Sequence, residues 1–147
     1  MITTNLKLVR ESLQKAEQSI GSGAEALASE AMTILIQLSK NEIQGRRGKT
    51  DGVWDKATAG QPPMNRTGNL RRSITGQKRK VGFGQYQVIV GPTIEYGRAV
   101  ELGGAYAPRS WKGTSAMKGF PYMAPAYIKF KPMLPALVRK HLSVGGK

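Results

Sequence analysis

Three short clusters of basic side chains could bind anions. They are Arg46-Arg47-Gly48-Lys49, Arg71-Arg72 and Lys78-Arg79-Lys80. Guanidinium groups bind phosphates and carboxylates through paired donors, so clusters on one surface could contact a nucleic-acid backbone without reading its sequence. Lys78, Arg79 and Lys80 are therefore candidates to face DNA. On a strand, alternation would place Arg79 opposite its two neighbours, and the alternative role of this cluster is an ordinary charged strand edge.

Side chains suited to catalysis or metal binding are sparse. The single histidine, His141, lies among basic residues, where we expect it to be solvated. Glu95 and Glu101, the only acids after residue 55, are six residues apart and do not align on a short helix. Cysteine is absent, and so is a Gly-x-x-x-x-Gly-Lys phosphate loop. The sequence predicts a protein that is not an enzyme and has no cofactor or metal; a small hydrolase using Glu101 and His141 is a remote alternative.

The net charge of +14 is confined to the C-terminal two-thirds of the chain. Residues 1–55 hold seven basic and seven acidic side chains, whereas residues 56–147 hold sixteen basic and two acidic ones. Such a field attracts polyanions or an acidic protein surface. Aromatic residues make up only 7% of the chain, so we do not expect base-specific recognition. Charge alone supports one alternative function, a freestanding, sequence-nonspecific nucleic-acid-binding protein.

The first 44 residues have the pattern of amphipathic helix. One apolar series has helical spacing: Leu6, Val9, Leu13, Ala16 and Ile20. Gly21-Ser22-Gly23 should then break or bend the helix before a second apolar stripe from Ala24 to Leu38. Glu25 and Glu30 interrupt that stripe, so it cannot span a bilayer, and no signal-peptide pattern is present. We expect two helices, or one bent helix, in a soluble protein without membrane contact.

Two segments, Gly45–Asn65 and Gly103–Gly119, lack a clear period and contain one tryptophan each, Trp54 and Trp111. Irregular segments of about this length inside a domain are usually functional or disordered. We expect arms that become ordered on adjacent subunits or partner proteins, with Trp54 and Trp111 at the contact. For the first segment the alternative is a merely disordered insert.

The middle of the chain predicts a short helix followed by a β-hairpin. Thr67 can cap a turn that places Leu70 and Ile74 on one side and Arg71 and Arg72 on the other. Two strand-like runs, Ile74–Val81 and Tyr86–Val90, then flank a Gly82-Phe83-Gly84 turn.

A second short helix is predicted over Glu95–Leu102, closed by Gly103-Gly104. Tyr96, Val100 and Leu102 should bury it, which leaves Arg98 and Glu101 for polar contacts. Glu101 could pair with Arg71 or Arg72 of the same subunit or of the next one.

A helical pattern from Ala126 to Leu142 ends the chain. Pro132 and Pro135 should kink it or end it in steps, and residues 143–147 read as a frayed tail. The order of helices, hairpin, short helix and C-terminal helix predicts the α+β class, with a small antiparallel sheet and long loops in a single domain spanning residues 1–147.

Three motifs in this order resemble those of the tail-component family of long-tailed bacteriophages. The motifs are Thr67-Gly68-Asn69-Leu70-Arg71-Arg72-Ser73-Ile74 after Pro62-Pro63, then Tyr96 with Val100-Glu101-Leu102-Gly103, then Pro121 with Ala124-Pro125-Ala126. The first motif is the most specific. The resemblance covers about residues 5–142, and the long Gly103–Gly119 segment departs from it, because many relatives pass more directly to the last motif.

The resemblance implies a ring-forming virion protein of the neck, often hexameric, that acts as a tail-completion or tail-terminator-like protein and joins tail to head. Its expected partners are further copies of itself, the adjacent head-connector and tail-tube proteins, and genomic DNA through non-specific contact. It would assemble in the host bacterial cytoplasm. The candidate interface residues are Arg66, Arg71, Arg72, Trp54, Arg98, Glu101 and Trp111.

Overall fold

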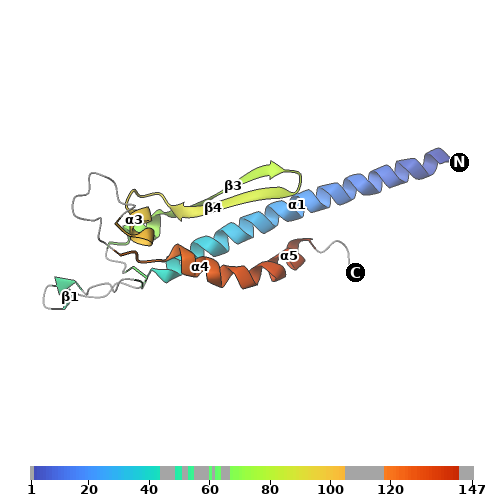
Figure 1. Ribbon diagram of the computed structural model, residues 1–147. Coiled ribbons are helices and arrows are strands. Elements are labelled where there is room, and N and C mark those ends of the chain that lie inside the picture. Colours follow the sequence, from blue (N-terminus) through green and yellow to red (C-terminus); the bar gives the residue numbers. More distant parts are fainter. Residues whose placement is uncertain are drawn as a thin grey trace.

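One long helix forms the axis of the protein in the computed structural model, which describes residues 2–43, 49–50, 53–54, 60, 62–63, 67–104 and 118–142. The elements are α1 (Ile2–Glu42), β1 (Lys49–Thr50), β2 (Val53–Trp54), α2 (Asn69–Ser73), β3 (Ile74–Gly82), β4 (Gln85–Pro92), α3 (Gly97–Leu102), α4 (Met123–Phe130), the 3-10 turn η2 (Lys131–Met133) and α5 (Leu134–Leu142). The β3–β4 hairpin and the α4–α5 run both lie along α1 (Figure 1). The predicted α+β class is confirmed.

Of the two alternatives predicted at Gly21-Ser22-Gly23, two helices or one bent helix, the structure has a single helix, because α1 continues through these residues as one 41-residue helix. A glycine inside a helix costs only about 1 kcal/mol, which packing along the rest of α1 can offset. Gly23 has a different role: a Cβ there would collide with the backbone carbonyl of His141. The glycine therefore lets the end of α5 approach the backbone of α1 closely.

The hairpin packs one face against α1. β3 and β4 are antiparallel, with Lys78 opposite Val88 and Lys80 opposite Tyr86, and Gly84 closes the turn with a φ of +61°. Tyr86, Val88 and Val90 are half-buried while the residues between them are exposed, as the alternation predicted. Gly76 allows this approach, because a Cβ there would lie 2.6 Å from Cγ of Met32.

The C-terminal run proceeds in steps around its prolines, as expected, from α4 through η2 to α5. Phe130 and Leu137 are buried against Ala31 of α1 and form one hydrophobic cluster. A second cluster, Ile43, Ile74 and Tyr122, lies where α1 ends and α4 begins. No helix in the described ranges is long and apolar enough to cross a membrane.

Candidate functional site

The carboxylate of Glu101 holds the N-terminus of α4. Its Oε2 accepts hydrogen bonds from the backbone N–H groups of Tyr122 (2.7 Å) and Met123 (2.9 Å), and its Oε1 accepts one from Ala124 (3.0 Å). Helix α4 has no N-cap side-chain bond and no acidic residue in its first turn. A carboxylate is well suited to this position, because the first N–H groups of a helix lack partners and carry partial positive charge.

Tyr122 stabilises the same region, where α3 meets the start of α4, from inside the protein. Its side chain is fully buried, and its hydroxyl donates to the carbonyl oxygen of Gly97 at 3.2 Å. Burial raises the pKa of this phenol well above its usual value, and the negative charge of Glu101 raises it further. Tyr122 is therefore neutral, as its role as a hydrogen-bond donor requires.

Two glycines allow close packing in this region, one between α3 and the end of β4 and one between α3 and the segment before α4. A Cβ on Gly97 would collide with the ring of Pro92, and one on Gly119 would lie 2.6 Å from the carbonyl oxygen of Glu101. Phe120 N–H also donates to the carbonyl oxygen of Val100 at 2.6 Å. The Glu-Leu-Gly and Pro-Ala motifs, separate in sequence, thus form one structural unit.

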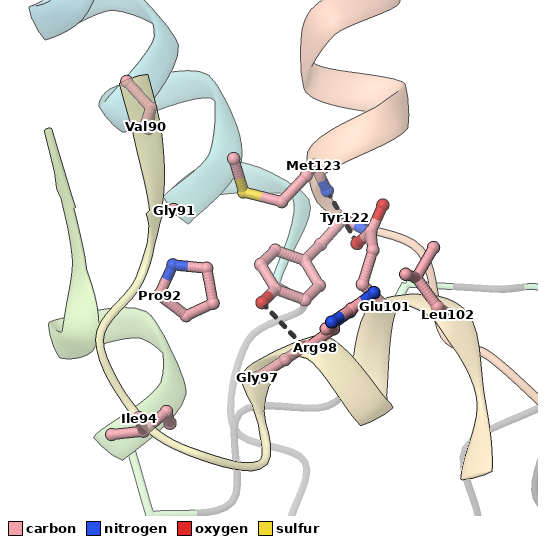
Figure 2. A pocket seen from close by; sticks show the side chains of 10 residues that line it. All are labelled: Val90, Gly91, Pro92, Ile94, Gly97, Arg98, Glu101, Leu102, Tyr122 and Met123. Atoms are coloured by element: carbon pink, nitrogen blue, oxygen red, sulfur yellow. Dashed lines mark hydrogen bonds between the residues drawn. The ribbon is translucent and has the colours of Figure 1, made fainter. Parts of the chain in front are cut away.

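A pocket of about 300 Å³ opens at this unit, between the end of β4, α3 and the start of α4 (Figure 2). Its wall is mainly apolar and includes Pro92, Leu102 and Met123, while Arg98 and Glu101 supply the polar part. With Glu101 engaged by three amides, the pocket has no free acid–base pair.

The α2 turn presents its arginines to solvent, as predicted. Arg71 and Arg72 are exposed, and the guanidinium of Arg72 donates to Oδ1 of Asn69 at 2.6 Å and to the carbonyl oxygen of Thr67 at 3.3 Å. Leu70 and Ile74 face the cluster around Tyr122. The N-cap position differs from the prediction, because it is Gly68, in a left-handed conformation with φ of +79° and no side-chain cap bond. Glycine adopts this conformation without strain. Oγ1 of Thr67, one residue earlier, accepts a long hydrogen bond of 3.4 Å from the backbone N–H of Asn69.

The candidate DNA-facing residues divide between the two faces of β3. Lys78 donates to Oε1 of Glu25 (2.9 Å) and to Oγ of Ser29 (2.7 Å), both on α1. Arg79 donates to Oε1 of Gln87 at 2.9 Å on the outer face, and Lys80 is exposed. The alternation predicted for Arg79 is confirmed. Lys78 binds side chains of α1 in its own chain.

Three expectations about individual side chains are wrong. Leu102 is 52% exposed, whereas Ala99 of the same helix and the adjoining Tyr122 are fully buried. His141 is not solvated: only 18% of its side chain is accessible, and its Nε2 contacts Glu30, which also binds Lys140 at 2.8 Å. Within the described residues Glu101 forms no ion pair with Arg71 or Arg72 of its own chain, since its oxygens bind α4. A pair with the next subunit stays a prediction.

The remote hydrolase alternative also fails on geometry. Glu101 binds the first residues of α4, whereas His141 lies in the last turn of α5, at the other end of the C-terminal run (Figure 1). The described residues contain no group of three or more metal-ligating side chains.

Some predicted interface residues lie outside the described residues. These are Arg66, Trp111 and most of both predicted arms, Gly45–Asn65 and Gly103–Gly119. Trp54 lies in β2, which pairs with β1 inside the first of these segments. The interface roles of all seven candidates stay predictions.

One comparison with known proteins decides the family. The model of a family described as "Bacteriophage HK97-gp10, putative tail-component" matches residues 7–103, about two-thirds of the chain. The chain belongs to this family. The match in this phage tail component includes most of α1, the hairpin and α3 with Glu101, and it ends before α4. No curated protein and no solved structure matches the chain.

Sequence reasoning missed the function of Glu101 as the cap of α4. A usable signal was present: Glu101 is one of two acids in the basic region, and α4 begins without a Ser, Thr, Asp or Asn before it. The carboxylate comes from 21 residues away in sequence, so a search for caps next to the helix could not find it.

Proposed function

We propose that this phage tail component is a structural protein of the neck, which completes or caps the tail and joins it to the head. It forms a ring, in the simplest case a hexamer, around the path of the DNA. Its partners are neighbouring copies, the adjacent head-connector protein and the tail-tube protein. Its role is structural and not catalytic.

The observation that carries this proposal is how the chain uses its few acidic side chains. Glu25, Glu30 and Glu42 form ion pairs inside the chain, and Glu101 binds backbone amides. Many basic side chains remain exposed: Arg71, Arg72, Arg79, Lys80, Arg98, Lys131 and Arg139. A positive surface of this kind suits a sequence-independent contact with DNA passing through a ring.

Exposed apolar side chains support contact with other proteins. Tyr127 and Ile128 lie on the outer side of α4, and Ile128 is 70% exposed. The pocket beside Glu101 opens near the start of the same helix. Apolar patches and pockets on a surface commonly mark protein–protein contacts, which a ring protein makes on two different faces.

Immunogold labelling of intact virions tests the location. We expect label at the head–tail junction; label along the tail shaft or at its distal tip would overturn the neck assignment. The mass of the purified assembly tests the ring, which should be a closed oligomer of defined size.

The alternative of a freestanding nucleic-acid-binding protein rests on the same exposed cations. It predicts that the isolated monomer binds duplex DNA with a steep dependence on salt and is absent from virions. The neck proposal predicts that the protein is part of the virion, even if the monomer has negligible affinity for DNA.

A further inference from the structure

The turn of the β3–β4 hairpin carries exposed apolar side chains. Phe83, inside the turn, is 62% exposed, and Val81, at the end of β3, is 53% exposed. Phe83 stands between Gly82 and Gly84, so neither neighbour in sequence has a side chain that could shield it. We call residues 81–84 the tip. Aromatic side chains are enriched where proteins contact one another, and the tip has this character.

The pocket beside Glu101 lies at the opposite end of the same hairpin, next to α3 (Figure 1). β4 spans eight residues between the turn and the pocket, which is roughly 25 Å at the rise of a β-strand. The tip therefore cannot reach the pocket of its own chain. The pocket volume of about 300 Å³ is at the lower end of the range for small-molecule sites. Its mainly apolar wall, which includes Pro92, Leu102 and Met123, suits a single aromatic ring.

Charge favours the tip of a second copy as the occupant of this pocket. Glu95 follows the pocket residue Ile94, is exposed, and has no ion-pair partner among the described residues. Glu101, the only other acid of the basic region, is already bound to the start of α4. Lys80, three residues before Phe83, is exposed beside the tip. Insertion of a tip into the pocket of another copy would bring these opposite charges to the same rim, where their attraction supports the contact.

An exposed apolar side chain of α1 lies on the same side of the molecule as the tip. The turn rests on α1 at Ile20, since a Cβ on Gly84 would lie 3.5 Å from Cγ2 of Ile20. Leu13 is seven residues from Ile20, which is about two helical turns, so both side chains are on one side of α1. Leu13 is 58% exposed, and α1 continues past the tip (Figure 1). A second copy seated on the tip would lie along this side of α1 and cover Leu13.

We propose that each copy inserts Phe83 of its tip into the pocket beside Glu101 of the next copy. Each copy then offers its tip to one neighbour and its pocket to the other, so the two surfaces in contact are different. Contacts of this type generate a ring when the rotation between copies closes. The inference rests on the proposed function, because it names the contact that holds neighbouring copies of the ring together.

Photo-crosslinking in assembled particles tests the contact. The photoreactive amino acid p-benzoylphenylalanine, placed at position 83, keeps an aromatic ring there and on illumination bonds to adjacent C–H groups. We expect covalent dimers of this chain in which position 83 is joined to the pocket at Met123 or Leu102. The length of the hairpin excludes such a link within one chain. The matched control is the same probe in place of Ile89, which is 58% exposed but lies away from the tip, and it should give few dimers.

The cross-linked products separate this contact from the ring itself. The proposal is overturned if position 83 links to another protein or to DNA, or if no covalent dimer forms. If the purified assembly still has the mass of a closed oligomer, the ring stands and a different contact holds it together. A protein that is monomeric in the particle would refute the ring as well.

Substitutions test whether assembly needs the contact. Phe83→Ser removes the inserted ring and should lower the yield of joined particles at least about tenfold, while circular dichroism shows an unchanged fold because Phe83 is exposed. Ile89→Ser removes an equally exposed apolar side chain and should leave the yield unchanged. Full yield with Phe83→Ser, or an equal loss with Ile89→Ser, would contradict a specific role of the tip.

Charge exchange tests the pairing at the rim. Lys80→Glu and Glu95→Lys should each lower the yield of joined particles, and the double variant should recover it, because the opposite charges are restored. A contact of Lys80 with DNA predicts no recovery, so failure of the double variant would overturn the proposed pairing of tip and pocket.

Discussion

At the scale of single residues, Glu101 makes the contact on which the candidate site depends. Glu101→Ala leaves three backbone N–H groups at the start of α4 without their charged acceptor, and it should lower the free energy of unfolding by about 2–3 kcal/mol. Glu101→Gln retains an acceptor oxygen and should cost about half as much. Chemical denaturation measures both.

The control for this prediction is Glu95→Ala, since Glu95 is the other acid of the basic region and is exposed. It should change the free energy of unfolding by less than about 0.5 kcal/mol. Equal effects of Glu95→Ala and Glu101→Ala would mean that net charge, and not capping, determines the result.

Two further glutamates should make the protein sensitive to acid. Hydrogen bonds from Lys78 to Glu25 and from Lys140 to Glu30 hold the pKa of each carboxyl below its ordinary value of 4.5. The folded chain then binds fewer protons than the unfolded chain, so this stabilisation is present above about pH 4.5 and is lost as the pH falls through the lower folded-state pKa values. Unfolding free energies between pH 7 and pH 3 should fall more steeply for wild type than for Glu25→Gln/Glu30→Gln.

Because Glu25 is exposed and 31% of the Glu30 side chain is accessible to solvent, salt should screen the effect. Parallel pH profiles of the two proteins at low ionic strength would show that these pairs contribute nothing to acid sensitivity.

At the scale of elements, two glycines in α1 should respond in opposite directions to alanine. Gly21 has open space where a Cβ would lie, so Gly21→Ala should raise the free energy of unfolding by about 0.5–1 kcal/mol through helix propensity alone. Gly23→Ala would push the backbone of His141 away and should lower the free energy of unfolding by about 1–2 kcal/mol. Stabilisation by both substitutions, measured by thermal and chemical unfolding, would mean that α5 does not pack closely on α1.

Elements whose signals are local could be predicted from the sequence. The turn at Gly82-Phe83-Gly84 determined the hairpin, and Pro132 determined the stepwise C-terminal run. The sequence could not decide between two helices and a single helix over the first 44 residues, because a glycine that breaks a helix and one that admits another element look alike in sequence. The same limit applies to the cap of α4 and to the exposure of Leu102, which depend on contacts between distant segments.

At the scale of the whole molecule, the arginines of α2 should matter for assembly and not for folding. Arg71→Glu with Arg72→Glu changes exposed side chains, and the hydrogen bonds of Arg72 to Asn69 and Thr67 are local. The free energy of unfolding should change by no more than about 1 kcal/mol, while the yield of infectious particles should fall. Lys131→Glu/Arg139→Glu makes the same charge change on the C-terminal run, so an equal fall in yield with both variants would mean that overall charge, and not the α2 pair, determines assembly. Unchanged yield with the α2 variant would remove this pair from the assembly interface.

The most direct test of the central claim, a structural role in joining tail to head, is electron microscopy of particles made without this protein. We predict filled heads and separate tails, with joined virions restored when the protein is supplied in trans. Normal numbers of joined virions in its absence would contradict a role at the neck.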